Sequence, residues 1–305
     1  MKGSGRMFIR KSKRTARIVI AALLLTMTAW LLPGDLTVEK ADAAVKLKKP
    51  VIVEDSSMAS GQKVTWDCIY FGSYPQREVV ADEAAYDSLF RGNDTVKGYY
   101  NKDTDVIEDV ALVDKLENIK YWDRNIDITL DDGSRYRRMT KTEATGYDDE
   151  YNDIQRYNWK NADSCHYFKY EPIKWRVLDV SGSDVLLMAD KALDNQPYNV
   201  DWDFITWENS TIRSWLNGYG SSENAKGYDY TDREDNDNSN FIDTAFTSAQ
   251  KNAIKTADVV NNDSIYCETD GGNDTKDKVF LLSDAEVYDT DAAASYGFVK
   301  EKRYA

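Results

Sequence analysis

The chain has 305 residues, of which 53 are acidic and 39 are basic, so it carries a net charge of −14 at neutral pH. A surface of this sign repels phosphate and argues against nucleic acid as a partner. His166 is the only histidine. A zinc site built from several histidines is therefore excluded, and a Ser-His-Asp triad is excluded unless His166 is its histidine.

Residues 1–43 have the order of an export signal: basic residues precede the uncharged apolar run Ile18–Leu32, and small residues follow at Ala41 and Ala43. The run is shorter than the ~20 residues of a membrane span. We therefore predict a signal peptide over 1–43 and a secreted or cell-surface protein. The alternative is that this segment remains uncleaved as a membrane anchor, and it would then be the only part of the protein in contact with a membrane. The remainder keeps 31 basic and 50 acidic residues, a net charge of −19 that suits a soluble exported protein.

Residues 44–60 read as a polar leader or linker, and 61–305 as one domain. Apolar side chains alternate over 64–70, which predicts a strand. Gly72 and Pro75, within the stretch FGSYPQ, are expected to end that strand in a turn.

Two charged insertions are expected in this domain, at about 77–165 and 220–240. Inside the first, the sequence indicates a helix over 109–120 and a hairpin over 126–139 that turns at Asp-Asp-Gly. Residues 140–163 hold few aliphatic side chains and are expected to form a surface loop.

The second half shows the clearest order. Residues 173–180 and 184–190 predict a buried hairpin around Ser-Gly-Ser. A short helix follows, capped by Ser210 or Asn209 and ended by Gly218. Trp175, Trp207 and Trp215 are expected to fill the core, and Arg213 to form a salt bridge with Glu208 or Asp179.

Two capping boxes mark further helices, one from Thr247 to Gln250 and one from Ser283 to Glu286. The second follows the apolar run 278–283, which is typical of a central strand.

In order, the segments FGSYPQ, EPIKWRVLDV, TWENSTIRSWLNG, FIDTAFTSAQKNAI and DKVFLLS resemble a bacterial exported domain catalogued only as a domain of unknown function. The resemblance covers 64–76 and most of 171–288. That family is in turn similar to the C-type-lectin-like fold of sulfatase-modifying factors and bacterial surface adhesins. It implies an α+β domain with short helices packed on antiparallel strands and long loops.

The family continues into a further tryptophan-rich stretch and a closing strand, and neither is present here. The resemblance therefore implies a C-terminally incomplete domain. We expect apolar surface to be exposed around 279–282, where the partner strand would be missing.

Aromatic and amide side chains gather before the short helix. Tyr198 and Trp202, with Asn199 and Asp201, could stack on sugar rings and bond their hydroxyls, which predicts a glycan or a surface protein as ligand. No cofactor is required, but Asp270, Asn273 and Asp274 surround two glycines and offer a possible Ca²⁺ site.

An extracellular enzyme is the rival class. A hydrolase would need paired carboxylates, and Glu171, Asp179 and Glu208 border the matched segments. An oxidase of the formylglycine-generating type would need a reactive cysteine pair, but Cys68, Cys165 and Cys267 fall outside the matching motifs. Their disulfide pairing stays open. A structural spacer of a larger surface protein is the third alternative.

Overall fold

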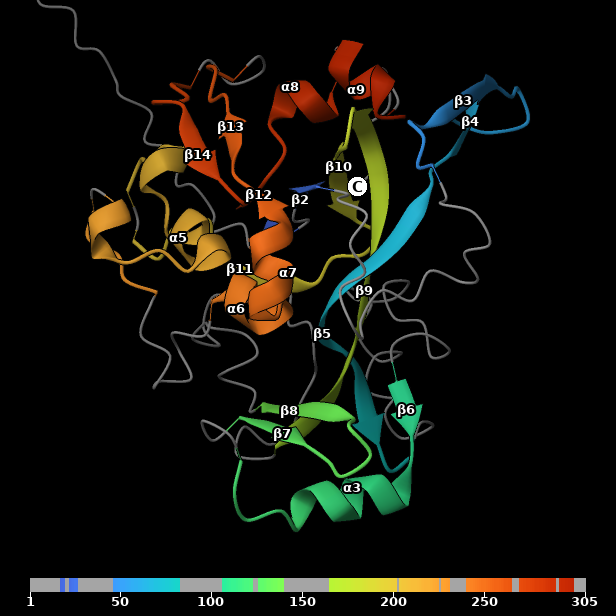
Figure 1. The fold of residues 1–305 in the computed structure, drawn as a ribbon, viewed down its shortest axis with the longest axis vertical. Coiled ribbons are helices and arrows are strands. Elements are labelled where there is room, and N and C mark those ends of the chain that lie inside the picture. Colours follow the sequence, from blue (N-terminus) through green and yellow to red (C-terminus); the bar gives the residue numbers. More distant parts are fainter. Residues whose placement is uncertain are drawn as a thin grey trace, which may run out of the picture.

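The computed structural model describes a set of separate ranges of the chain. They are 17–19, 22–26, 46–82, 106–122, 126–139, 165–201, 203–224, 226–230, 240–264, 269–288 and 291–298. Helices and antiparallel strands are mixed, as the sequence predicts. Two long strands, β5 (Cys68–Val80) and β9 (His166–Ser181), pair along the length of the molecule (Figure 1).

These two strands organise the main sheet, whose order is β12 (Ile254–Lys255), β2 (Ala22–Thr26), β10 (Asp184–Ala189), β9, β5 and β6 (Val106–Glu108). The upper half of β9 also pairs with β10 (Asp184–Ala189), and its lower end pairs with β8 (Arg135–Met139). Two further strands join at the sides, since β7 (Asp127–Thr129) pairs with β8 and β15 (Val279–Phe280) pairs with β2.

The stretch FGSYPQ lies inside β5 and does not end it, so the predicted turn is wrong. Register shifts on either side of Ser73 and Tyr74 bulge the strand instead. Gly72 permits the first bulge, because its φ is +72° and a Cβ there would lie 2.5 Å from Cε1 of Phe246. The stretch FGSYPQ, with its glycine and proline, therefore bulges β5, and the strand continues to Val80.

The lower region lies around the lower ends of β5 and β9 and consists of β6 (Val106–Glu108), α3 (Val110–Glu117), β7 and β8 (Figure 1). The helix and the hairpin predicted for this segment are present. They enclose a second core that consists of Val79, Leu116, Trp122, Tyr136 and Tyr167. The segment expected to be a charged insertion thus has a core of its own. The loop predicted over 140–163 lies outside the described residues.

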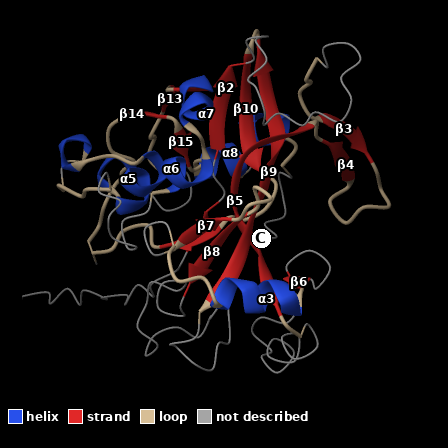
Figure 2. Cartoon of the chain, turned by 60° about the horizontal axis from the view of Figure 1, so that its bottom comes forward, coloured by secondary structure: helices blue, strands red, loops and turns tan. Residues whose placement is uncertain are grey.

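The upper region holds the main core and most of the helices (Figure 2). Its remaining elements are β11 (Asp194–Gln196), η2 (Trp207–Asn209), α5 (Thr211–Asn217), η3 (Ser221–Glu223), α6 (Phe241–Ala245), α7 (Ser248–Ala253), β12 (Ile254–Lys255), β13 (Ala257–Val259), β14 (Thr275–Asp277), α8 (Asp284–Val287) and α9 (Asp291–Ser295). Ser210 caps α5, Gly218 ends it in the left-handed conformation, and both predicted capping boxes form.

The tryptophans occupy the places expected from the sequence. Trp175 is fully buried and donates from Nε1 to the carbonyl of Phe71 at 2.7 Å. Trp215 is 5% exposed and packs against Phe241, with ring centroids 5.8 Å apart. Trp207 is 8% exposed and belongs to the same main core.

The segment predicted as a leader or linker contains a strand. β3 (Val51–Glu54) and β4 (Gln62–Thr65) form a hairpin in which every residue of β3 pairs with a residue of β4. All four residues of β3 are exposed. Gly297, just after α9, packs so closely on this hairpin that a Cβ would lie 2.6 Å from Cγ1 of Val64.

The apolar N-terminal run also contributes strands. β1 (Arg17–Val19) pairs with β11, and β2 (Ala22–Thr26) lies between β10 on one side and β12 and β15 on the other. Val279 and Phe280 are consequently buried at 0% and 6% exposure. The expectation of exposed apolar surface there is wrong for the full chain, because β2 supplies the partner strand. Among the described helices, none has the length and apolarity to cross a membrane.

Candidate functional site

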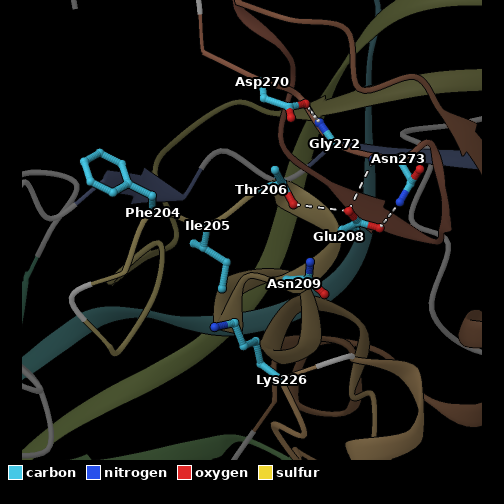
Figure 3. Close-up of a pocket in the computed structure, with 9 residues that line it drawn as sticks. All are labelled: Phe204, Ile205, Thr206, Glu208, Asn209, Lys226, Asp270, Gly272 and Asn273. Carbon is cyan, nitrogen blue, oxygen red and sulfur yellow. Dashed lines mark hydrogen bonds between the residues drawn. The ribbon is translucent and has the colours of Figure 1, made fainter.

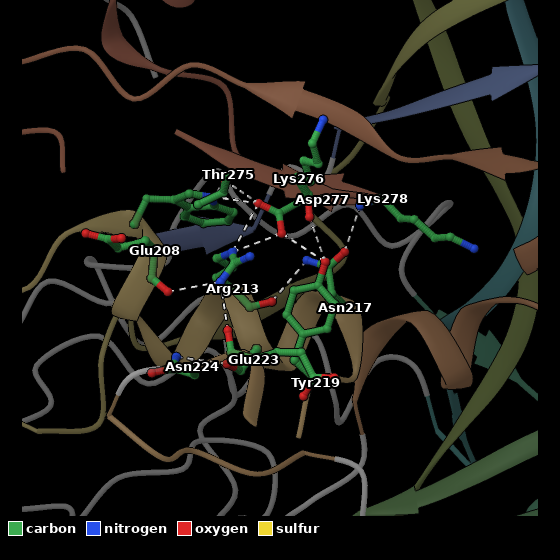
Figure 4. A network of polar contacts seen from close by, with 12 residues as sticks. Glu208, Arg213, Asn217, Tyr219, Glu223, Asn224, Thr275, Lys276, Asp277 and Lys278 are labelled. Atoms are coloured by element: carbon green, nitrogen blue, oxygen red, sulfur yellow. Dashed lines mark hydrogen bonds and ion pairs between the residues drawn. The ribbon is translucent and has the colours of Figure 1, made fainter. Parts of the chain in front are cut away.

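A buried ion pair stabilises the loops that form the candidate site (Figure 4). Arg213, on α5, donates from Nε to Oδ1 of Asp277 at 2.9 Å, and Asp277 is fully buried. Glu208 contributes only its backbone carbonyl, which accepts from Nη1 of Arg213 at 3.0 Å, and Asp179 pairs with Lys49 instead. The salt bridge predicted for Arg213 is therefore present with a different partner.

Further donors surround the Asp277 carboxylate. Trp207 Nε1 lies 2.9 Å and Thr275 Oγ1 2.6 Å from Oδ2, while the Tyr219 hydroxyl lies 3.0 Å from Oδ1. Burial, and then the neighbouring carboxylate, raise the pKa of the Tyr219 phenol above its usual value, so that it stays a donor. The cluster joins η2, α5 and β14 into one unit.

The side chain of Asn217 completes the outer edge of β15. Its Oδ1 accepts from the amides of Lys278 and Val279, both at 3.0 Å, and its Nδ2 donates to the carbonyl of Val279 at 2.8 Å. The amide group thus takes the place of a neighbouring strand.

Beside this unit, a hollow of about 420 Å³ opens to the surface (Figure 3). It is lined by Phe204, Ile205, Thr206, Glu208, Asn209, Lys226, Asp270, Gly272 and Asn273. The segment 204–209 forms one wall and the loop 270–273 forms another.

Glu208 joins the two walls of the hollow. Its carboxylate accepts from Nδ2 of Asn273 at 2.9 Å and from the amide of Asn273 at 3.3 Å, while Thr206 Oγ1 lies 3.4 Å away on its own side. Close packing requires Gly272, since its φ is +82° and a Cβ would lie 2.7 Å from Cβ of Thr206. These contacts of Glu208 and Gly272 hold the two walls of the hollow against each other.

Apolar and charged groups flank the opening. The ring of Phe204 is fully exposed and stands away from the polar residues (Figure 3). Lys226 Nζ lies 3.2 Å from Oδ2 of Asp203, an ion pair exposed on both sides. The lining of the hollow thus combines one exposed aromatic ring with carboxylate, amide and ammonium groups.

The residues predicted to bind sugar lie just before this hollow. Tyr198 is half-buried against the main core, and Asn199 Oδ1 accepts from the amide of Thr211 at 3.1 Å, which secures the start of α5. Asp201 is exposed and accepts from the Tyr228 hydroxyl at 2.5 Å. Trp202 lies outside the described residues. Of the three described members of the predicted set, Asp201 is thus the one that the structure places at the surface.

The predicted Ca²⁺ ligands engage separate partners. Asp270 Oδ1 accepts from the amide of Gly272 at 2.8 Å, and Asp274 Oδ1 accepts from the amide of Asn261 at 2.9 Å, whereas Asn273 bonds Glu208. Across the described ranges, no three His, Cys, Asp or Glu side chains are grouped in a way that could hold a metal ion. The Ca²⁺ site stays a prediction, with Asp270 and Asn273 both lining the hollow.

The carboxylates considered for hydrolysis lie in different places. Glu171 pairs with Arg77 at 2.5 Å, Asp179 with Lys49, and Glu208 faces the hollow. Glu171 and Asp179 are eight residues apart on β9, roughly 27 Å at the usual rise of a strand. A catalytic pair needs a separation of about 5–9.5 Å, which excludes these two acting together.

Neither of the two described cysteines lines the hollow. Cys68 and Cys165 are exposed free thiols, and burial raises the pKa of Cys68 above its usual value. Cys267 lies outside the described residues.

Sequence reasoning missed Phe204, Ile205 and Lys226. The segment DWDFITWEN alternates aromatic and acidic residues, a pattern in which some aromatic rings are buried and others face water. Trp207 is the buried ring and Phe204 is an exposed one, so this pattern was a usable signal for Phe204. Lys226 offered none, because it comes from a polar loop whose position depends on Asn224, which is buried beneath α5.

Comparisons with known proteins agree with part of the resemblance. Residues 182–304 match the family model described as Domain of unknown function (DUF6273), so this part of the chain carries a domain of unknown function. The match begins just before β10 and includes the ion pair and the hollow. No curated protein and no solved structure matches the chain.

Proposed function

We propose that this protein is an exported or cell-surface binding module of C-type-lectin-like architecture, and that its ligand is a glycan bound at the hollow beside Phe204. The short helices beside a mainly antiparallel sheet support the fold assignment. The order of the N-terminal residues supports export.

The fully exposed ring of Phe204 at the edge of a polar hollow is the observation that carries the proposal. An exposed phenyl ring costs free energy in water unless a ligand covers it. Sugar rings have an apolar face that stacks on aromatic side chains, and hydroxyls that pair with carboxylates and amides. Asn209, Asn273 and Glu208 supply such groups in the lining of the same hollow.

Binding is better supported than hydrolysis. Glu208 is the one carboxylate of the considered three at the hollow, and it already accepts hydrogen bonds from Asn273. That pairing suits a residue that shapes a site and presents acceptor lone pairs to a ligand. The spacer alternative leaves the exposed ring without a role.

A glycan array probed with the labelled full chain tests the proposal. We expect binding to a restricted set of glycans, and the variant Phe204→Ala should lose about tenfold in affinity, which corresponds to ~1.4 kcal/mol. Tyr121→Ala is the matched control, because Tyr121 is 87% exposed in the lower region, and it should bind like the wild type.

Two results would redirect the assignment. Turnover of a glycan that stops after a single change, Glu208→Gln, would make the protein an enzyme. A folded chain that binds no glycan, with both aromatic variants indistinguishable from the wild type, would favour the spacer. N-terminal sequencing of secreted material tests export separately, and we expect it to begin at Ala44 or Val45.

A further inference from the structure

We propose that the position of β2 is a strand-acceptor site: a slot in the main sheet that takes an apolar β-strand of another polypeptide when Ala22–Thr26 leaves it. This site is distinct from the hollow, and it does not depend on glycan binding.

Backbone pairing defines the slot on both sides. β2 pairs with β10 along its whole length, from Asp184 opposite Thr26 to Met188 opposite Ala22. On its other side it pairs with β12 and then with β15, again antiparallel. An occupant therefore satisfies hydrogen-bonding groups on two edges at once, which is the mode by which a peptide adds to a sheet with strong main-chain affinity.

The register also places the slot over the main core. Position 25 of β2 lies opposite Val185 on one side and Ile254 on the other, each 2% exposed. Position 23 lies opposite Leu187 and Val279, both fully buried. Directly opposed residues share one face of a sheet, so a vacant slot would open this face to water, and an apolar strand matches it.

An ion pair reaches across the slot. Asp184 stands on β10 opposite Thr26, and Lys255 stands on β12 opposite Leu24. The Nζ of Lys255 lies 2.6 Å from Oδ1 of Asp184. Because β2 runs between these two strands, the pair spans the occupant and holds the two edges at the spacing that a strand requires.

The resident strand and the edges of the slot come from distant parts of the chain, since the edges are residues 184–188, 254–255 and 279–280. Exchange requires β2 to unpair from these edges and β1, in the same segment, to unpair from β11. The same segment belongs to the part that the export prediction removes. Export would then convert a filled slot into an open one.

The occupancy of the slot can be tested first in the uncut full chain. In a background without Cys68, Cys165 and Cys267, the pair Leu24→Cys and Leu186→Cys occupies a register position where a disulfide can form. We expect cross-linking there, and none between Leu24→Cys and Val53→Cys, because Val53 lies on the separate β3–β4 hairpin.

Exchange is tested by inserting a specific protease site between residues 34 and 44 of the full chain. After cleavage, the N-terminal fragment should remain bound through native purification. A labelled peptide with the sequence of residues 18–30 should then replace it, whereas the same peptide with Leu24→Pro should not, since proline cannot donate to a central strand. Lys255→Met should speed the replacement severalfold, and Lys276→Met, in an exposed pair with Asp258, should leave it unchanged.

Three outcomes would overturn the proposal. The fragment could leave and the remaining chain stay monomeric, with unchanged cooperative unfolding and no uptake of peptide. The fragment could stay bound and never exchange, which would make β2 a permanent strand. The emptied chains could instead associate with one another and exclude the peptide, which would make a second copy the occupant.

Discussion

The upper and lower regions each bury an aspartate against arginine, but the partners come from different distances along the chain. Asp277 in the upper region binds Arg213, Trp207 and Tyr219, which lie 58 to 70 positions away. Asp127 in the lower region binds Arg135 and Arg137, which lie eight and ten positions away on the same hairpin. Tyr170 on β9 adds a longer-range bond at 3.0 Å.

This difference separates two uses of buried charge. The lower pair forms within one hairpin, so it stabilises a local unit and attaches it to β9. The upper pair requires η2, α5 and β14 to meet, because Arg213, Trp207 and Tyr219 are distant from Asp277 in sequence and only Thr275 is a local donor. Its contribution is to fix how the walls of the hollow sit against one another, rather than to form any single element.

Loss of the upper aspartate should have the largest effect. Asp277→Ala leaves the buried Arg213 guanidinium without its counter-charge, and breaking such a pair costs about 3–5 kcal/mol in the free energy of unfolding. Asp258→Ala is the matched control, because it removes an aspartate from an ion pair that is 79% exposed at Asp258, and it should cost less than about 1 kcal/mol. Urea denaturation measures both.

A small effect of Asp277→Ala, equal to that of the control, would contradict the comparison. It would mean that water enters and solvates Arg213, so that the upper pair does not determine how these segments pack.

Local signals predicted much of this fold. The caps of α5, α7 and α8 and the hairpins β9–β10 and β7–β8 all follow from residues a few positions apart, such as Ser210 with Gly218. Long-range pairing could not be predicted this way. Nothing near Arg213 indicates Asp277, and nothing in the apolar run 18–32 indicates a sheet strand rather than an export signal.

The candidate site divides in the same way. The segment before α5 was identified from its aromatic and amide residues, but its placement beside 270–273 depends on Glu208 and Asn273, which are 65 positions apart. Gly72 was misread for a related reason. A glycine near a proline usually ends a strand, whereas here the close approach of Phe246 from another part of the chain requires the glycine within the strand.

The next prediction concerns the bulge at Gly72 in β5, where this strand contacts Phe246 and Ala245 of the upper region. In Gly72→Ala a Cβ would lie 2.5 Å from Phe246 and 2.7 Å from the carbonyl of Ala245. Backbone strain and overpacking together should cost about 3 kcal/mol in unfolding free energy. Gly61→Ala has the same φ of +72° and nothing within 4 Å, so it should cost about 1 kcal/mol. Equal costs would show that strain alone, without the contact, explains the glycine.

The lower aspartate gives the smallest effect and the one that depends on pH. Burial alone would raise the pKa of Asp127, but the guanidinium of Arg137, with its hydrogen bonds, and then Arg135 lower it below the usual 3.8. A carboxyl whose folded pKa is lowered contributes stability above its unfolded pKa, and loses that contribution as the pH falls through the folded value. We expect Asp127→Asn to cost about 2 kcal/mol at neutral pH, less than Asp277→Ala because Arg135 is one-third exposed.

The difference in unfolding free energy between the wild type and Asp127→Asn should then shrink as the pH falls below about 3.8, because the wild-type carboxyl also becomes neutral. Asp132→Asn is the control. The pKa of Asp132 is lowered too, by hydrogen bonds from Ser134, but this carboxyl is exposed, so its substitution should change stability less at every pH. A cost for Asp127→Asn that stays constant down to pH 2 would show that the cost reflects packing rather than charge. The hairpin would then be stabilised by the shape of this cluster, and the two regions would differ in more than the distance between their partners.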